Sequence, residues 1–403
     1  MKKIVIIGGG ASGLVAALTA KNNDNEVIIL ERNSSCGKKI LATGNGKCNY
    51  WNSDQDISHY HSTNEELLKT LITEEIKEES LTFFDDLGIY PKIKNGYYYP
   101  FSNQATTIKN ILLSEVENKN IIIKHNFLVE KIIKQNNFFE IQGADEMIKA
   151  DKVIIATGSK ASPKTGSDGI GYKLLTSLGH TIIEPLPALV QLKTTGSYLK
   201  SWAGIRTDVV VSLYEDNTLI KEEQGEIQLT DYGISGICIF NLSRYAAIGL
   251  NNNKKEIIKI NFLPFIKEEK ELLELLTKTN KPIKRCLEGI LNNKLVEVIL
   301  KQAKIPERKK YIELTKEEKN HLTTYLTEFE VELIGTNSFE QAQVCSGGVP
   351  LTEINLKTCE SRLIKDLFIV GELLDVDGDC GGYNLTVAWI TGMLAGKGSA
   401  SSD

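Results

Sequence analysis

Unbroken apolar runs and one helical stretch open the chain. Residues 2–7 and 26–31 are nearly continuous apolar runs, and residues 13–21 between them are rich in Ala and Leu. Apolar strands of this kind are typical of parallel sheets that are covered on both faces. We therefore expect a βαβ unit within the first 31 residues.

The pattern changes several times further along. A mixed polar stretch at 64–87 predicts a helix, and apolar runs predict strands at 121–123, 127–133, 138–141 and 153–156. From 189 to 265 short strands dominate, such as 208–214 and 256–262. Between 266 and 330, Lys, Glu and Leu recur at helical spacing, and the interleaved charges favour solvated helix faces over a DNA-reading motif.

The last part of the chain returns to the α/β pattern, with a strand at 367–370 and a helix at 384–395. We therefore predict an α/β protein in three parts. The parts are a discontinuous first domain at 1–188 and 345–403, a β-rich domain at 189–265 and 331–344, and a helical subdomain at 266–330.

The composition limits the classes of partner and the location that we expect for this protein. With 41% hydrophobic and 25% charged residues, the chain has the composition of an ordinary globular protein, and we expect no membrane partner. A net charge of -5 and a pI near 5.8 give no reason to expect a nucleic-acid partner. Seven scattered cysteines, and an apolar run after Met1 that is too short for a signal peptide, predict a cytoplasmic location. We expect no metal site, because the five histidines are dispersed.

The turn between the first strand and the first helix contains the first candidate binding motif. Gly8-Gly9-Gly10-Ala11-Ser12-Gly13 fits GxGxxG, in which backbone N–H groups and the helix N-terminus receive a pyrophosphate. The second strand ends in Glu31, where a carboxylate can accept hydrogen bonds from a ribose diol. These features predict a dinucleotide site, with NAD and FAD both open at this point.

Three further segments favour FAD. Residues 37–49 place small residues and cations soon after Glu31, as suits a long flavin dinucleotide. The strand at 153–156 leads into Ala156-Thr157-Gly158, which allows close approach of the adenosine half. Residues 370–384 contain Gly371 and Glu372, which could contact the ribityl chain. In the same segment Gly381-Gly382 precedes a helix, whose positive N-terminal end could stabilise a flavin.

These segments resemble a known family. GKKILATGNGKCN at 37–49, PKTGSDGIGY at 163–172, TDYGISG at 230–236 and the segment 371–384 are similar to the bacterial aminoacetone-oxidase-like, or BaiN-like, FAD-dependent oxidoreductases over nearly the whole chain. One departure is Lys47, which stands where the family usually has arginine.

The resemblance implies a Rossmann-like FAD domain of the two-dinucleotide-binding type, interrupted by a β-barrel-like domain that carries a small helical subdomain. FAD would be held non-covalently. The residues expected to contact it are Gly8, Gly10, Ala11, Ser12, Gly13, Glu31, Arg32, Lys38, Lys39, Thr43, Gly44, Gly46, Cys48, Asn49, Val129, Ala156, Thr157, Gly158, Gly371, Glu372, Asp379, Gly381, Gly382, Tyr383 and Asn384.

Two reactions on a small-molecule substrate stay open. One is an oxidase that takes hydride from an amine or amino ketone, favoured slightly because no second GxGxxG motif offers a nicotinamide domain. The other is reduction of an activated C=C bond, with NAD(P)H as a transient electron donor. Lys47 and Tyr383 are the candidate catalytic residues. A third hypothesis, of another class, is a flavin-binding redox sensor or an RNA-associated flavoprotein. The sequence leaves the oligomeric state open.

Overall fold

The computed structural model describes residues 1–266 and 268–401, and the chain divides into two compact units. Unit 1 comprises Met1–Leu186 and Gln343–Asp403, and unit 2 comprises Pro187–Ala342. Residues 267, 402 and 403, which fall within the predicted helical subdomain and the predicted C-terminal part of the first domain, lie outside the described residues.

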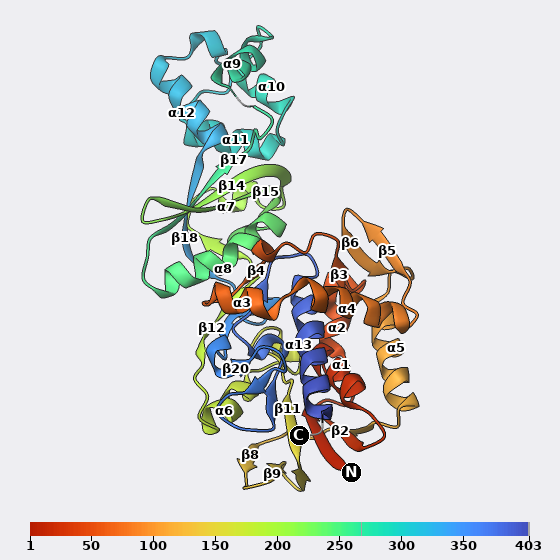
Figure 1. Ribbon diagram of the computed structural model, residues 1–403. Helices are drawn as coiled ribbons and strands as arrows, with labels where there is room; N and C mark the ends of the chain where they lie inside the picture. The colour runs from red at the N-terminus through yellow and green to blue at the C-terminus, as the bar shows by residue number, and fades with distance from the viewer. Residues whose placement is uncertain (267, 402–403) are drawn as a thin grey trace. The chain divides into compact units, whose positions relative to one another are not determined.

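A seven-stranded sheet organises unit 1 (Figure 1). Its order is β20 (Ile354–Asn355), β21 (Glu360–Ser361), β22 (Leu367–Ile369), β11 (Lys152–Ile155), β1 (Lys2–Ile7), β2 (Asn25–Glu31) and β7 (Ile122–His125). The strands from β22 to β7 are parallel, whereas β21 runs antiparallel to both of its neighbours, β20 and β22. The predicted Rossmann-type α/β fold is thereby confirmed, and both ends of the chain contribute to one sheet.

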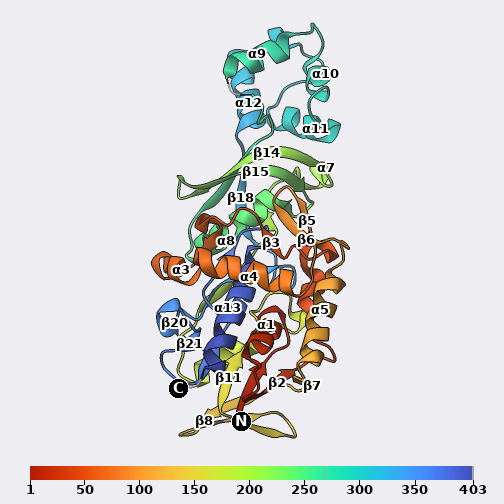
Figure 2. The same ribbon diagram turned by 45° about the vertical axis from the view of Figure 1, so that its right-hand side comes forward.

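Two helices pack closely in unit 1. Helix α1 (Ala11–Ala20) follows β1, and α13 (Tyr383–Ala400) lies beside it (Figure 2). A Cβ atom at Gly392 would lie 2.5 Å from the carbonyl oxygen of Ser12, and one at Gly396 would lie 2.6 Å from that of Ala16. Because glycine has no Cβ, the two helix backbones can approach closely at these points.

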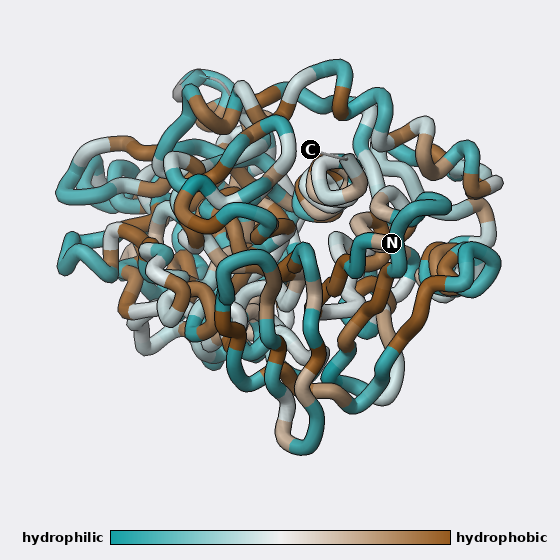
Figure 3. The backbone as a smooth tube through the Cα atoms, turned by 60° about the horizontal axis from the view of Figure 1, so that its bottom comes forward, coloured by the Kyte–Doolittle hydropathy of each residue, from teal (hydrophilic) through white to brown (hydrophobic). Residues whose placement is uncertain are grey.

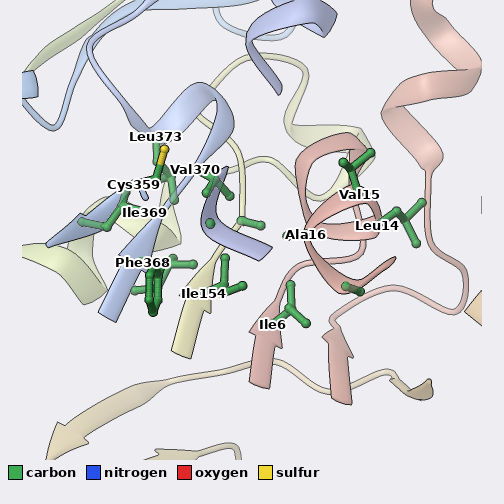
Figure 4. Packing of buried hydrophobic residues seen from close by; sticks show 14 of the residues in the cluster. Ile6, Leu14, Val15, Ala16, Ile154, Cys359, Phe368, Ile369, Val370 and Leu373 are labelled. Carbon is green, nitrogen blue, oxygen red and sulfur yellow. The ribbon is translucent and has the colours of Figure 1, made fainter. Parts of the chain in front are cut away.

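The core of unit 1 lies where these helices meet the sheet. Ile6 of β1, Ile154 of β11 and Phe368 of β22 are at most 1% exposed, and Ala16 of α1 is fully buried near them (Figure 4). The hydropathy colouring shows the same contrast between apolar strands and polar loops (Figure 3). Burial of each large apolar side chain stabilises the fold by about 1.5–3 kcal/mol.

Smaller elements complete unit 1. Its other helices are α2 (Lys38–Ala42), α3 (Glu65–Leu71), α4 (Glu74–Asp86), α5 (Ala105–Asn118) and α6 (Ile170–Ser177). Three small sheets join β3 (Trp51–Asn52), β6 (Tyr97–Pro100) and β5 (Pro91–Lys94); β4 (Tyr60–His61) and β23 (Asp377–Gly378); and β8 (Lys131–Lys134), β9 (Phe139–Gln142) and β10 (Met147–Ala150).

Two predicted elements differ from the structure. The helix expected at 64–87 is two helices, because Thr73 interrupts it and its hydroxyl caps α4 by accepting from the backbone N–H of Ile76 at 3.4 Å. The strand expected at 127–133 is shorter and starts at Lys131, because the backbone N–H of Phe127 is instead bonded to the Glu31 carbonyl oxygen at 2.9 Å.

Unit 2 is built on a closed barrel, which confirms the predicted β-barrel-like domain. Its strands follow the order β13 (Leu192–Thr194), β16 (Gly233–Ser235), β15 (Thr218–Leu229), β14 (Arg206–Glu215), β17 (Glu256–Asn261) and β18 (Phe329–Thr336). The short helix α7 (Leu199–Trp202) precedes β14. Between β17 and β18, the described residues form the helices α9 (Glu269–Thr277), α10 (Ile283–Glu288), α11 (Asn293–Gln302) and α12 (Lys316–Thr327). Strands β12 (Ile183–Ala188) and β19 (Val344–Gly348) pair as a two-stranded sheet.

The expectation that short strands dominate 189–265 missed a long helix. Helix α8 (Ile237–Asn251) packs against β15 and buries Cys238, Ile239, Leu242 and Ala246, which follow helical spacing. The β-branched and aromatic residues at its start favour a strand locally, and packing against the barrel overrides that preference. Among the helices of residues 1–266 and 268–401, none is both long and apolar enough to cross a bilayer.

Candidate active site

The glycine turn after β1 is shaped for a close approach of backbones. A Cβ atom at Gly13 would lie 1.9 Å from the carbonyl oxygen of Gly8, and Gly8 itself has a φ of +106° with the Ala156 carbonyl oxygen beside it. A Cβ atom at Gly10, by contrast, would meet nothing within 4 Å. Gly10 is the N-cap of α1 and no side chain caps that end. Uncapped N–H groups beside open space suit a pyrophosphate, so this end of unit 1 fits a dinucleotide.

Glu31 fastens the end of β2 to this turn. One of its carboxylate oxygens accepts from the backbone N–H of Gly9 at 2.9 Å, and the other accepts from both the backbone and the side-chain nitrogen of Asn33 at 2.7 Å. The carboxylate is therefore already engaged by protein donors, although an ionised carboxylate has further lone pairs. Arg32 is paired with Asp168 at 2.6 Å, and although burial opposes ionisation, this guanidinium helps to hold the pKa of Asp168 below its usual range.

The end of β11 lies against the same turn. A Cβ atom at Gly8 would be 2.4 Å from the Ala156 carbonyl oxygen and 3.1 Å from Cα of Thr157. The hydroxyl oxygen of Thr157 is buried and has no hydrogen-bond partner. Gly158 has a φ of +75°, which favours glycine. Val129 is buried in the segment after β7.

A second cluster joins residues from three distant parts of the chain. The ammonium group of Lys39 lies 2.6 Å from Glu372, whose carboxylate also accepts from the hydroxyl of Ser159 at 2.8 Å. The neighbouring Lys38 donates to the side-chain oxygen of Asn33 at 3.0 Å. The backbone N–H of Gly371 donates to the hydroxyl of Thr391 at 2.9 Å. Lys38, Lys39 and Glu372, which the sequence singled out, are thus partners of protein groups.

The segment 43–52 lies against the turn 378–384. The side-chain nitrogen of Asn52 donates to the Gly381 carbonyl oxygen at 3.0 Å, and a Cβ atom at Gly382 would lie 3.1 Å from the backbone of Trp51. Asn384 holds the turn closed, because its side chain bonds both the N–H of Gly378 at 2.9 Å and the carbonyl oxygen of Gly378 at 2.7 Å. The fold therefore brings together two of the segments that the sequence indicated as FAD-binding.

Within the segment 43–49 the residues differ in exposure. The side-chain oxygen of Asn49 is buried without a partner, as an oxygen would be that accepts from a bound group. Cys48 is fully buried, and burial raises the pKa of its thiol to about 12. Lys47 is exposed, as are Gly44 and Gly46, while Thr43 is partly buried and bonds the Ile40 carbonyl oxygen at 2.7 Å.

Sequence reasoning missed the histidines of this region. His59 and His61 each bond the carboxylate of Asp379, at 3.2 and 2.9 Å. Tyr383 stacks on His59, with ring centroids 4.5 Å apart. Burial, followed by the charges of Asp54 and other groups, raises the pKa of Tyr383 well above its usual value. The spacing of the two histidines, which are the only close pair in the chain, was the available signal.

No group of three or more His, Cys, Asp and Glu side chains in residues 1–266 and 268–401 is arranged to hold a metal ion. No disulfide bond joins any of the seven cysteines, all of which lie in the described part of the chain. Burial raises the pKa of Cys36, as it does that of Cys48, to about 12, so neither thiol is suited to act as a thiolate.

Comparison with known proteins places these features in context. The family model described as "HI0933-like protein Rossmann domain" matches residues 2–398. The chain is 40% identical to the 3-dehydro-bile acid delta(4,6)-reductase of Clostridium scindens, over 99% of both chains. It is 27% identical to the ribosomal RNA dihydrouridine synthase of Escherichia coli, over 96% of this chain and 94% of that protein.

Solved structures show the same fold. A flavocytochrome c3 fumarate reductase in its open conformation matches with a TM-score of 0.51 and 14% identity, covering 99% of this chain and 78% of that one. The 3-ketosteroid delta1-dehydrogenase of Sterolibacterium denitrificans matches with a TM-score of 0.50 and 10% identity, covering 99% of this chain and 100% of that one. The family match and the reductase relative, which both span the chain, confirm the resemblance stated from the sequence: the chain belongs to the HI0933-like family and is an FAD-dependent oxidoreductase.

Proposed function

We propose that the protein reduces a C=C bond conjugated with a carbonyl group, using NAD(P)H as electron donor. The observation that carries this proposal is the 40% identity, over 99% of both chains, to a protein named as a 3-dehydro-bile acid reductase. Dihydrouridine formation, after which the 27% identical relative is named, is likewise a two-electron saturation of a C=C bond conjugated with a carbonyl. Two relatives with different substrates thus share one bond chemistry, which favours the reductase over the amine oxidase.

FAD, in this proposal, lies along unit 1 from the glycine turn to the Gly378–Asn384 turn. The free N–H groups at the start of α1 receive the pyrophosphate, since Gly10 leaves open space there. The unpartnered oxygen of Asn49 accepts a hydrogen bond from the flavin end of the cofactor. When bound, FAD supplies the hydride transfer that no protein side chain can perform.

The remaining site residues hold the backbone of the proposed cofactor site in place. Helix α13 starts at Tyr383 behind Gly382, with no side-chain cap, so its positive end is available to negative charge on a bound group. Asn52 and Asn384 fix the backbone of that turn through the bonds described above. Lys39 and Glu372 neutralise each other and hold the α2 segment to the strand end after β22. The predicted contacts of all these residues with FAD stay proposals.

A substrate test separates the reductase from the oxidase. Purified, FAD-loaded protein is mixed anaerobically with NADH or NADPH, and bleaching of the flavin absorption is followed. A 3-oxo-4-ene steroid acid is then added, and the mass of the product is measured by mass spectrometry. A product two mass units heavier supports the proposal. Hydrogen peroxide formed from an amine or amino ketone in air, with no bleaching by either nicotinamide, would overturn it.

RNA is a second candidate substrate. The relatives named for ribosomal RNA, at 27% and 28% identity, leave our expectation of no nucleic-acid partner without support. Residues 278–310 also hold ten Lys and Arg against three Glu, within a chain whose net charge is -5. Binding of a ribosomal RNA fragment that weakens steeply with salt would favour this substrate, and dihydrouridine in the recovered RNA would establish it.

A further inference from the structure

Four acidic and imidazole groups form a continuous hydrogen-bonded chain in unit 1. Nε2 of His59 lies 3.1 Å from Oδ2 of Asp54, Nδ1 of His59 lies 3.2 Å from Oδ2 of Asp379, and Nε2 of His61 lies 2.9 Å from Oδ1 of Asp379. Side-chain exposure falls from 65% at Asp54 to 28% at His59 and 8% at Asp379, and it is 11% at His61. This series of hydrogen bonds therefore runs from the surface to the interior.

The four hydrogen-bonded groups come from the N-terminal and C-terminal parts of the sequence. Strand β4 pairs antiparallel with β23, so that His61 lies opposite Asp377 and Tyr60 opposite Gly378. The backbone N–H of Asp379 donates to the His59 carbonyl oxygen at 2.9 Å, which fixes the two segments side by side. The inner end of the chain thus belongs to the Gly378–Asn384 turn, where we place the flavin end of the cofactor.

The hydrogen-bond geometry suits His59 to relay a proton. Its two ring nitrogens face carboxylate oxygens of different residues, Asp54 and Asp379, so the ring can take up a proton on Nε2 and release one from Nδ1. The backbone N–H of Asp56 and the ring of His59 hold the pKa of Asp54 below its usual range, which keeps that carboxylate ionised. Asp56, which interacts electrostatically with the ring, and Tyr383, which stacks on it, are further titratable groups close to His59.

We propose that Asp54, His59, Asp379 and His61 form the path by which a proton from solvent reaches the reaction site. The inference rests on the proposed function, because reduction of a C=C bond by NAD(P)H consumes one proton: NAD(P)H, a proton and the alkene give NAD(P)⁺ and the saturated product. One carbon gains hydride and the other gains the proton. Asp54 collects the proton at the surface, and His59 passes one ring proton to Asp379 as it accepts another from Asp54. His61 acts at the inner end.

Two variants test the path, and a third controls for the loss of an acidic group. Asp54→Asn removes the exposed entry group, and His59→Gln removes the group that can carry a proton. Asp56→Asn is the control, since Asp56 lies on the same segment and its carboxylate accepts from the backbone N–H of Ser58 at 2.9 Å. Each full-length variant is first checked for FAD absorbance and melting temperature. Because Asp54 is exposed, its variant is expected to fold even if the His59 variant does not.

The first readout does not depend on turnover. Nitrogen-15 NMR of the imidazole rings should show His59 resonances in Asp54→Asn that differ from those of the wild type, because the partner of Nε2 is changed. Asp56→Asn should leave these resonances close to those of the wild type. His59 resonances that are the same in Asp54→Asn and in the wild type would overturn the proposal.

The second readout separates the two halves of the reaction. Bleaching by NAD(P)H should be within about twofold of the wild type in all variants. The subsequent reduction of the enone should slow by about tenfold or more in Asp54→Asn and His59→Gln, the range expected for lost proton transfer, and added imidazole should restore part of the rate of His59→Gln. If the wild type does not reduce the enone, the proposed function fails and the path with it. If the wild type does and both variants match it, only the path is wrong.

Discussion

The ammonium group of Lys39 lies 2.6 Å from a carboxylate oxygen of Glu372, a residue 333 positions later in the sequence. The pair is only partly exposed, at 25% and 18% of the two side chains, and the hydroxyl of Ser159 donates to the same carboxylate. It connects α2 to the segment that follows β22. The pair therefore fastens the N-terminal and C-terminal parts of unit 1 to each other beside the proposed cofactor site.

Glu372→Ala should lower the free energy of unfolding by about 1–2 kcal/mol, because it leaves the Lys39 charge partly buried without its partner. Urea unfolding of the FAD-loaded protein measures the change. The double variant Lys39→Met with Glu372→Leu should recover part of the loss, since neither charge is then left alone. Glu66→Gln, which breaks the exposed pair with Lys69, serves as the control and should leave the midpoint unchanged. Equal midpoints for wild type and Glu372→Ala would refute this role.

Gly10→Ala and Gly13→Ala should fail in different ways. At Gly13 a Cβ atom would lie 1.9 Å from the Gly8 carbonyl oxygen, so this variant should lose stability even without cofactor. At Gly10 a Cβ atom meets nothing in the protein, so Gly10→Ala should keep the melting temperature of the cofactor-free protein. It should weaken FAD binding by about tenfold or more, equivalent to about 1.4 kcal/mol, because the methyl group occupies space proposed for the pyrophosphate.

Fluorescence titration of deflavinated protein with FAD measures this effect. Gly289→Ala is a suitable control, because its Cβ would meet only the Cys286 carbonyl oxygen at 3.5 Å, an ordinary contact. Unchanged FAD affinity in Gly10→Ala would place the pyrophosphate elsewhere.

Glu256 should make the barrel less stable as the pH rises. Burial, with the charges of Glu215 and Asp216, raises the pKa of Glu256 to about 7 from 4.5. The folded state therefore binds more protons than the unfolded state between these values, so the free energy of unfolding falls as the pH rises from about 4.5 to 7. Glu256→Gln should flatten this dependence and stabilise unit 2 at pH 8, on the order of 1 kcal/mol.

Thermal unfolding between pH 5 and pH 8, followed by a signal from unit 2, tests this. Glu222→Gln is the matched control on β15, since Glu222 is exposed and accepts from the hydroxyl of Ser212 at 2.8 Å. The same pH slope in Glu256→Gln and wild type would contradict the assignment.

The buried thiols should resist alkylation. Burial raises the pKa values of Cys36 and Cys48 to about 12, so almost no thiolate is present at pH 8. Brief treatment of the native protein with iodoacetamide, followed by peptide mass spectrometry, should label the partly exposed Cys286 before either of them. Rapid labelling of Cys48 in the folded protein would show that this thiol is reactive after all.

Much of the fold could be predicted from the sequence, because local conformational preferences and the tertiary structure agree. The unbroken apolar strands at 2–7 and 26–31 and the Gly8–Gly13 turn predict a βαβ unit, and β1, α1 and β2 form it. Helix α8 was missed, because its first residues favour a strand and only packing against β15 determines that they are helical. The single helix expected at 64–87 failed for a smaller reason, the cap at Thr73.

The sequence by itself determined the family and the βαβ unit, because glycine conformations and apolar periodicity act over a few residues. It also predicted the residues that contact FAD. Only the tertiary structure decided which of those residues meet. It engaged Glu31 with Gly9 and Asn33, paired Lys39 with Glu372, and placed His59 and His61 on either side of Asp379. The contacts of Glu372 and Asp379 depend on the pairing of β11 with β22 and of β4 with β23, strands separated by more than 200 residues, and no local pattern specifies such pairing.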